Sequence, residues 1–318
     1  MPVRDIPVVA APSLDTSAGR EALDRACVEW GFFQLVDHGV PPALVGEALA
    51  QMRAFFALPV DAKRSIERTR ENPWGFYDRE LTKNVRDWKE VFDFGPAHGA
   101  EVTPWPDAMP AFRETMTRVY EACAEVARRL VAAIARNLGA SPDDLLRCFD
   151  DHTSYLRLNY YPRCHDPAPP DAPTRPERGA LAVHHHTDAG ALTVLLHDGR
   201  PALQVERGGV WHTIAPRDDA FVINLGDVVQ VWSNDRYRAP LHRVLASRDG
   251  ERYSAPFFLN PSYATRFAPL ASACAGAPAR YRAIGWRAYR AGRAAGDYAD
   301  LGEEIQIAHF RVEANALP

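Results

Sequence analysis

The chain has 318 residues, of which 47% are hydrophobic and 25% are charged. These fractions are ordinary for a folded globular protein and exclude a long disordered chain, a collagen and a coiled coil. The formal net charge is −4, so no basic surface is expected to hold a nucleic-acid backbone. At about 150 residues per domain the length corresponds to roughly two domains, although one large β-domain with added helices also fits.

The cysteines and the N-terminal residues indicate the cellular compartment in which the protein is expected. The five cysteines are scattered, odd in number and never arranged as CxxC, which disfavours a disulfide framework or a thiolate zinc site and favours a reducing compartment. The first apolar stretch is short and is broken by Pro7 and Pro12, unlike a signal peptide. No later run reaches the ~18 to 20 apolar residues that span a bilayer. We therefore expect a soluble, cytoplasmic protein with no membrane partner.

Helical patterning dominates the first 150 residues, where apolar side chains recur every three or four positions. Capping residues and prolines mark the starts of helices, and a short aromatic and β-branched run marks a strand. The mixed-charge run at residues 63–71 is typical of a solvated helix face. The predicted elements are a helix from Thr16 or Ser17 to about Glu29, a strand at residues 32–40, and helices that begin at Pro41-Pro42 and that span residues 111–138 and 142–148.

From Thr153 onward the apolar period changes from 3.6 to 2. Short runs alternate with Gly, Asp and Asn turn signals about every eight to twelve residues, which is typical of an antiparallel sandwich or barrel. The predicted strands are residues 155–161, 181–183, 192–196, 203–205, 210–214, 221–224, 228–232, 241–245 and 252–260. A Pro-rich surface loop is expected at residues 162–176 and a C-terminal helix from about Pro278 to Arg293. The sequence thus predicts a mainly β fold with flanking helices, divided into residues 1–150 and 151–318.

The densest group of metal-ligand side chains is the run His184, His185 and His186, followed by Asp188. On an extended segment residues i and i+2 point the same way, so His186 and Asp188 can face one ion. His242, in a later predicted strand, can supply a third ligand. Two histidines and one carboxylate leave three positions open on an octahedral ion, as in non-haem Fe(II) oxygenases, while the same set can hold Zn²⁺ with a water in a hydrolase. Because no acid follows His184 or His185 at that spacing, we expect these two to pack or to support the ligands.

Arg252 and Ser254 stand two apart on the last predicted strand, so both can point into one cavity. The forked guanidinium suits a carboxylate, and the serine adds a hydroxyl donor. Fe²⁺ with one aspartate carries a net positive charge, which favours a chelating anion. A 2-oxo acid with two carboxylates would place one end on the metal and the other on Arg252. Most arginines form ion pairs at the surface. Because Arg252 and Ser254 follow His242 by ten and twelve residues, we instead expect Arg252 to point into the cavity that holds the metal ligands.

Nine motifs follow one another along the chain, and their joint order and spacing are more specific than any one of them. They are IPVV (6–9), WGFFQLVDHGVP (30–41), TKNVRDWKEVFDF (82–94), NYYP (159–162), HTDAGALTVLL (186–196), LQV (203–205), VINLGD (222–227), HRV (242–244) and RYSAPFFLNP (252–261). Together they resemble the 2-oxoglutarate and Fe(II)-dependent dioxygenases of the isopenicillin N synthase-like group. The resemblance covers nearly the whole chain.

This resemblance implies a distorted double-stranded β-helix, a relative of the jelly roll, with an N-terminal helical region and a C-terminal helix. It implies that iron is held by His186, Asp188 and His242, and that 2-oxoglutarate is bound by Arg252, Ser254, Tyr161 and Asn159. It also implies that the substrate pocket includes Phe258 and members of an N-terminal aromatic group, Trp74 and Tyr77 foremost, with Phe76 and Trp88. Phe258 can equally be a core aromatic, and most aromatics of the N-terminal group are expected to be core residues.

The sequence departs from the family pattern at two places. Cys164-His165 stands where the family usually has cysteine-proline, and His197-Asp198 stands where glutamine-aspartate is common. Neither departure touches an expected metal ligand, so they bear on the substrate loop.

The expected function is oxidative decarboxylation of 2-oxoglutarate, with Fe(II) and O₂, coupled to hydroxylation or desaturation of a small organic molecule. Two alternatives stay open. One is an Fe(II) oxidase of the isopenicillin N synthase type, which would use Arg252 and Ser254 to bind its substrate's own carboxylate. The other is a small-molecule-binding protein without turnover. Besides the small-molecule substrate, no nucleic acid, membrane or obligate protein partner is expected.

Overall fold

The computed structural model describes residues 6–99 and 101–312, whose strands form one eight-stranded sheet, one four-stranded sheet and two small two-stranded sheets. The larger sheet has the order β1 (Val8–Ala10), β2 (Phe32–Val36), β12 (Ala220–Leu225), β9 (Leu192–His197), β14 (Arg252–Leu259), β7 (Tyr155–Tyr161), β6 (Glu90–Phe94) and β3 (Gly75–Tyr77). The smaller has the order β11 (Val210–Thr213), β10 (Leu203–Arg207), β13 (His242–Leu245) and β8 (Leu181–His186). All neighbours within these sheets are antiparallel except β1 and β2. The expected mainly β fold with flanking helices is confirmed.

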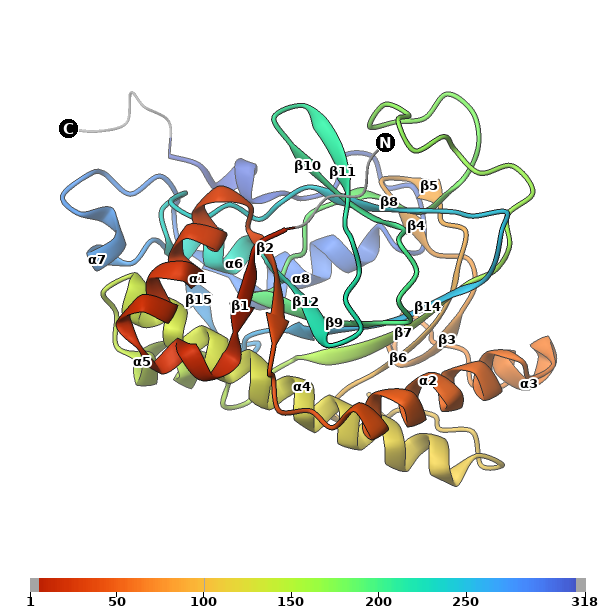
Figure 1. Ribbon diagram of the computed structural model, residues 1–318. Helices are drawn as coiled ribbons and strands as arrows, with labels where there is room; N and C mark the ends of the chain where they lie inside the picture. The colour runs from red at the N-terminus through yellow and green to blue at the C-terminus, as the bar shows by residue number, and fades with distance from the viewer. Residues whose placement is uncertain (1–5, 100, 313–318) are drawn as a thin grey trace.

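Three helices cover one side of the larger sheet. α4 (Pro110–Asn137) contacts β9 and β14, and both α1 (Ser17–Glu29) and α2 (Pro42–Phe56) pack on α4. In Figure 1, α4 runs along the lower edge of the molecule, and the β10–β11 hairpin projects at the top. The remaining elements are α3 (Val60–Arg64), α5 (Pro142–Leu146), α6 (Asp227–Trp232), α7 (Ala271–Cys274), α8 (Trp286–Ala295), the short strands β4 (Leu81–Thr82), β5 (Val85–Arg86), β15 (Arg266–Phe267) and β16 (Ile284–Gly285), and the 3₁₀ turns Ala11–Asp15, Arg147–Phe149 and Ile307–Phe310.

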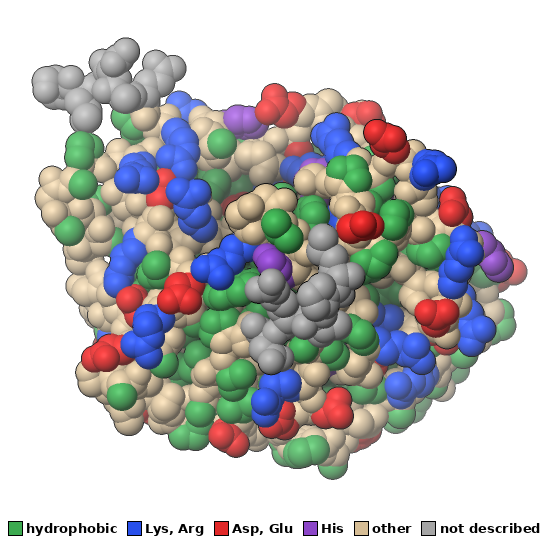
Figure 2. All heavy atoms as spheres, turned by 45° about the horizontal axis from the view of Figure 1, so that its top comes forward, with side chains coloured by type: hydrophobic (Ala, Val, Ile, Leu, Met, Phe, Trp, Pro, Cys, Tyr) green, Lys and Arg blue, Asp and Glu red, His purple; other side chains and the backbone are tan. Residues whose placement is uncertain are grey.

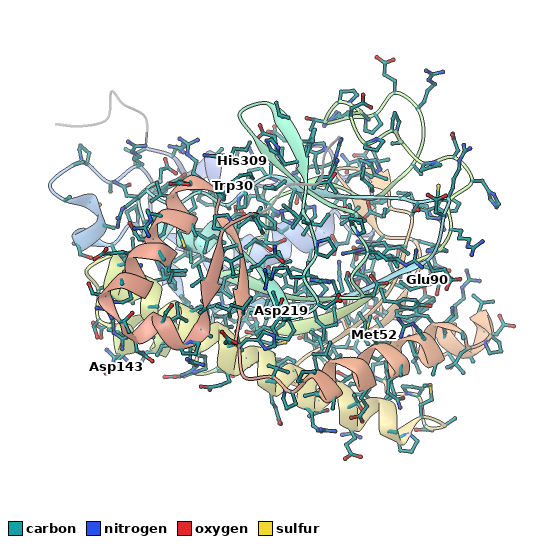
Figure 3. All side chains as sticks on the ribbon, in the orientation of Figure 1. Trp30, Met52, Glu90, Asp143, Asp219 and His309 are labelled. Atoms are coloured by element: carbon teal, nitrogen blue, oxygen red, sulfur yellow. The ribbon has the colours of Figure 1, made fainter. Side chains whose placement is uncertain are left out.

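Local chemistry explains where the first helices begin. The Thr16 side chain accepts a hydrogen bond from the Gly19 backbone amide and caps α1, as expected of a threonine at that position. Pro42 lies in the first turn of α2, where its missing N–H costs no helical hydrogen bond. Met52 of α2, labelled in Figure 3, is fully buried in the apolar core. These helices therefore present a continuous apolar face to the sheet.

Three sequence predictions that concern helices and strands are wrong. Residues 228–232, predicted as a strand, lie in α6. Four of the five residues are apolar, so the periodicity of this short run could not separate a strand from a buried helix. The backbone amides of Asp227 and Val228 donate to the carbonyl oxygens of Asp188 and Gly190, which satisfies the start of the helix and ties it to that loop.

The C-terminal helix begins at Trp286, eight residues after the expected start at Pro278. Between them Tyr281 and Ile284 are buried, and β16 pairs with β15. Because this segment has partners in the sheet and core, it stays extended. The Trp286 indole donates to the Thr153 hydroxyl at 2.8 Å, which fixes the first residue of α8 against the sheet.

The N-terminal part is less purely helical than the sequence indicates. It contributes β1, β2, β3 and β6 to the larger sheet. Strands from before residue 150 thus flank those from after it in one sheet, with β2 beside β12 at one edge and β6 beside β7 at the other.

The mixed-charge run at residues 63–71 is not a solvated helix face. Only its first two residues are helical, and Lys63 and Arg68 are each 5% exposed. The Arg68 guanidinium pairs with Asp93 at 2.7 Å and with Glu80 at 2.5 Å. These carboxylates lie 25 and 12 residues away, so local charge patterning could not reveal them.

One buried arginine binds the Pro-rich loop to the smaller sheet through hydrogen bonds. Arg243 is fully buried and donates to the carbonyl oxygens of Pro170, Ala172 and Pro173. Its guanidinium also lies 4.2 Å from the ring of Trp211. The loop that follows β7 is thereby held beside the strand that carries His242.

On the face shown in Figure 2, acidic and basic side chains are interspersed, in keeping with the small net charge. Among the described residues, no helix is both long enough and apolar enough to cross a bilayer.

Candidate active site

The three residues predicted as metal ligands converge. His186 ends β8, His242 begins β13, and these two residues are directly paired across the strands. Asp188 Oδ1 lies 3.6 Å from Nε2 of each histidine, and the three ligand atoms are all within 4.8 Å of one another. An ion about 2.1 Å from an imidazole nitrogen and a carboxylate oxygen fits between atoms at such a separation. In geometry, the three side chains can serve one divalent cation.

Backbone carbonyls fix the orientation of both imidazoles. Nδ1 of His186 is 2.8 Å from the His184 carbonyl oxygen, and Nδ1 of His242 is 3.0 Å from that of Pro240. Because Nδ1 of each ring must donate to a carbonyl, Nε2 is the nitrogen left to bind a metal, and both Nε2 atoms lie toward Asp188. Burial, reinforced by the neighbouring His242, lowers the pKa of His186 to about 3. The ring is therefore neutral at physiological pH, the form that binds a metal.

The carboxylate of Asp188 is held by two neighbouring side chains. Its Oδ2 accepts hydrogen bonds from the Thr193 hydroxyl at 2.5 Å and the Asn224 amide at 2.7 Å. Burial alone would raise the pKa of Asp188, but His242, His186 and these hydrogen bonds bring it below its ordinary value. Oδ2 is thus occupied and Oδ1 is free to face the histidines. Sequence reasoning quoted Thr193 and Asn224 within motifs but gave them no role.

Close backbone packing places the loop that carries Asp188. A Cβ atom on Gly226 would lie 2.2 Å from the Gly190 carbonyl oxygen and 2.9 Å from that of Asp188. Only glycine permits this approach, which allows α6 to bind the loop through its first amides. The close approach of the two backbone segments therefore requires the glycine of the VINLGD motif at this position.

We expect Thr193→Val to weaken Fe(II) or Mn(II) binding about 10- to 100-fold, the usual effect of removing a group that orients a metal ligand. Valine keeps the branched shape but cannot donate to Asp188 Oδ2. Anaerobic titration of the metal-free chain, followed by tryptophan fluorescence, measures the dissociation constant. Thr117→Val, an exposed position on α4, is the matched control; equal affinities for both variants would contradict the orienting role.

The four residues expected to bind an anion also come together. Arg252 and Ser254 of β14 pair directly with Tyr161 and Asn159 of β7, and all four side chains are buried. The Arg252 guanidinium lies 4.9 Å from the centre of the Tyr161 ring and donates to Ser254 Oγ at 3.4 Å. The hydroxyls of Tyr161 and Ser254 are 3.3 Å apart. A guanidinium and two hydroxyls thus lie within contact distance of one another in the interior.

Several polar atoms in this group have no protein partner. Arg252 Nε and Asn159 Oδ1 are buried without a hydrogen bond, and among the described residues no carboxylate lies within 4.0 Å of the Arg252 nitrogens. Burying a charge without a counter-ion is costly. The group therefore fits a bound anion, such as the far carboxylate of 2-oxoglutarate.

His197 is a further member of this group that sequence reasoning noted only as a departure from the family pattern. It ends β9 directly opposite Ser254. Its Nδ1 accepts from the Gly199 amide at 3.1 Å, so Nε2 carries the proton, and this donor is buried without a partner. Burial, reinforced by Arg252, lowers the pKa of His197 to about 4. Thr193 and His197 share one face of β9, about 13 Å apart along the strand, so this strand connects the metal ligands to the anion pocket.

A cavity of about 570 Å³ opens beside the proposed metal ligands and is lined by His186, Asp188, Phe258 and Trp74 among others. Two of the three expected substrate-pocket aromatics therefore face it. Tyr77 is not among the lining residues; its ring packs on Tyr298 at 5.4 Å.

The other members of the aromatic group lie elsewhere. Phe76 is fully buried in the core. Trp88 lines a second cavity, of about 620 Å³, together with His184 and His185. Neither residue lines the cavity beside the proposed metal ligands.

Two family models match the chain. One, described as the 2OG-Fe(II) oxygenase superfamily, matches residues 152–261. The other, described as the N-terminal region of non-haem dioxygenase in morphine synthesis, matches residues 1–112. The residues proposed to bind the metal and the anion, and also Phe258, lie within the first match. Trp74 and Tyr77 lie within the second.

Individual relatives agree with these matches. The chain is 34% identical over 255 residues to Jasmonate-induced oxygenase 2 of Arabidopsis thaliana, covering 78% of this chain and 66% of the relative, so it spans just under two thirds of that relative's length. It is 32% identical to Gibberellin 2-beta-dioxygenase 5 of rice over 92% of this chain and 83% of the relative. A crystal structure of JOX2 in complex with 2OG, Fe and JA superposes with a TM-score of 0.80 at 32% identity, covering 91% of this chain and 85% of that one.

Proposed function

The chain belongs to the 2-oxoglutarate and Fe(II)-dependent oxygenases, and from this premise we propose that it couples oxidative decarboxylation of 2-oxoglutarate to hydroxylation or desaturation of a small organic molecule. The observation that carries the proposal is the convergence of two imidazoles and one carboxylate, of which His186 and Asp188 line a cavity. The relatives whose names mention jasmonate and gibberellin support a small molecule as the substrate.

His186, Asp188 and His242 would hold the metal and leave three positions open. When bound, Fe(II) supplies the oxygen and electron chemistry of the reaction, which no side chain here provides. The protein keeps the His186 imidazole neutral and fixes the carboxylate through Thr193 and Asn224, so these side chains would meet the metal already oriented.

Arg252, Ser254, Tyr161 and Asn159 would bind the far carboxylate of 2-oxoglutarate. Their unpartnered buried atoms support this assignment, and the His197 Nε2–H would add a further donor. Phe258 and Trp74 would form part of the apolar wall of the cavity, on the side of the metal where the substrate binds.

The rival activity is an Fe(II) oxidase in which Arg252 binds the carboxylate of the substrate itself. The test measures succinate formation and 2-oxoglutarate consumption by the purified chain with Fe(II), ascorbate and O₂, with and without a panel of candidate metabolites. We expect succinate to form, to rise with a true substrate, to stop on chelation, and to return with Fe(II) but not Zn²⁺. Oxidation of a metabolite without loss of 2-oxoglutarate would establish the rival activity.

A further inference from the structure

The cavity beside the proposed metal ligands has a surplus of cations. Eight arginine and lysine side chains line it, against six carboxylates that include the metal ligand Asp188. Burial, together with nearby Glu80, raises the pKa of Asp297 to about 7, which reduces the negative charge further near neutral pH. A bound divalent metal would add to the surplus. The cavity therefore favours an anionic occupant in addition to 2-oxoglutarate.

Most of these cations are neutralised by the protein. Arg157 pairs with Asp93 and Glu80, and Arg293 pairs with Asp227 and Glu304. Among the described residues, three lining arginines have no carboxylate within 4.0 Å: Arg70, Arg287 and Arg290. Arg70 and Arg287 are exposed, so water solvates them. Arg290 is partly buried and is the cation that lacks both a counter-ion and full solvation.

Arg290 lies among aromatic rings on the cavity wall. Its guanidinium carbon is 5.5, 5.7 and 5.9 Å from the ring centres of Tyr263, Tyr155 and Trp74. It donates one hydrogen bond, to the Tyr263 hydroxyl at 3.2 Å, out of the five N–H groups that a guanidinium offers. The Trp74 indole N–H is also buried without an acceptor. The rings fix the guanidinium in place while leaving its donors for a ligand.

A continuous apolar wall leads from Arg290 to the metal ligands. The Tyr155 ring, next to the guanidinium, stacks on Phe258 at 4.8 Å. Phe258 of β14 is directly paired with Thr193 of β9, and the Thr193 hydroxyl binds Asp188. Two rings and one threonine thus separate the cation from the proposed metal. An acid held by Arg290 would present to the metal a carbon several bonds away from its carboxylate.

We propose that this cavity takes a small carboxylic acid, with its carboxylate paired with Arg290 and its apolar, flat or cyclic body along Tyr155 and Phe258. The site is distinct from the Arg252 pocket, which would hold the dicarboxylic co-substrate. The proposal deepens the proposed function, because it names the substrate class of that reaction, but it concerns binding and can be tested without turnover.

The test uses the full chain loaded with Mn(II) and 2-oxoglutarate under argon, where no oxidation occurs. The probes are 3-phenylpropanoate, 4-phenylbutanoate, 5-phenylpentanoate and cyclopentylacetate, each beside its primary amide, and the readout is the dissociation constant from ligand-induced thermal shifts. We expect at least one acid to bind about tenfold or more tightly than its amide, and this preference to disappear in Arg290→Gln. Arg290→Lys, which keeps the charge, should retain part of it. Arg282→Gln, exposed and outside the cavity lining, should keep all of it.

Three outcomes would overturn the proposal: binding of none of the acids, equal binding of acids and amides, or an acid preference that Arg290→Gln leaves unchanged. If Arg290→Gln instead weakens the binding of 2-oxoglutarate, the anion at this site is the co-substrate. Failure of the proposed function is separate, because it would appear as absence of succinate formation in air whatever the acid preference under argon.

Discussion

We expect Asp188→Ala to lower the rate of 2-oxoglutarate turnover at least ~1000-fold. Asp188 provides the one charged ligand atom of the proposed metal site, 3.6 Å from both imidazole nitrogens. Removing a group that merely supports a ligand weakens metal binding about 10- to 100-fold. Removing the charged ligand itself should therefore weaken metal binding, and with it turnover, by a larger factor. Succinate formation at saturating 2-oxoglutarate measures the loss.

The metal-free variant should nevertheless fold, because the substitution removes a buried charge whose desolvation is unfavourable without a cation. Only the hydrogen bonds from Thr193 and Asn224 are lost with it. The distinguishing measurement is thermal unfolding with and without Mn(II). At a metal concentration of about 100 times the dissociation constant, the free energy of unfolding of the parent should rise by about 2.7 kcal/mol. That of the variant should not change.

His185→Ala is the control for this experiment. His185 is the neighbour of His186 in the same histidine run, but alternation along β8 turns its side chain away from the ligands. The control should keep both turnover and the metal-induced stabilisation. Turnover that survives in Asp188→Ala, or that disappears equally in His185→Ala, would show that the ligand assignment is wrong.

Features with a local signature could be predicted from the sequence. The cap at Thr16 predicted the start of α1, and two-residue alternation predicted β7 with its bounds at Tyr155 and Tyr161. The approach of the His186 and Asp188 side chains was predicted for the same reason, since the spacing of two side chains on one extended segment is visible in the chain itself.

Features decided by distant partners could not be predicted in this way. The run at residues 228–232 is helical because its first amides bind the loop of Asp188 and Gly190, nearly forty residues earlier in the chain. Arg68 is buried because two carboxylates pair with it, Asp93 from β6 and Glu80 from the segment before β4. A single sequence shows neither contact, so local propensity and charge patterning gave the wrong answer.

The same limit applies within the site. Thr193 and His197 were visible in the motifs, but their roles depend on the register of β9 against β12 and β14, which places one beside Asn224 and the other opposite Ser254. The role proposed for Arg290 depends on a missing counter-ion, and a sequence cannot show that a charge has no partner.

We expect Arg252→Leu to raise the KM for 2-oxoglutarate roughly 30- to 5000-fold. Removing one member of a buried, hydrogen-bonded charge pair costs about 2–5 kcal/mol, and Arg252 is the cation among the four residues proposed to bind the co-substrate's carboxylate. Initial rates of succinate formation at varied 2-oxoglutarate concentration give KM and kcat separately.

Two further variants separate charge from packing. Arg252→Lys keeps the positive charge but loses the forked donors that match a carboxylate, so its KM should lie between those of the parent and the leucine variant. Arg248→Leu, an exposed position in the turn before β14, should leave KM unchanged. Because the leucine variant also loses the contact with the Tyr161 ring, its metal-induced thermal stabilisation should be checked; a normal value shows that the site is still folded.

The direction of the kinetic change decides between the two enzymatic activities. In a 2-oxoglutarate-dependent oxygenase, Arg252→Leu acts on the co-substrate, so high 2-oxoglutarate restores kcat and the KM for the primary substrate changes little. In an oxidase that binds its own substrate through Arg252, the KM for the primary substrate rises and 2-oxoglutarate has no effect. An unaltered 2-oxoglutarate requirement in a folded, metal-binding Arg252→Leu variant would place the co-substrate's carboxylate elsewhere, and Arg290 would then be its first alternative partner.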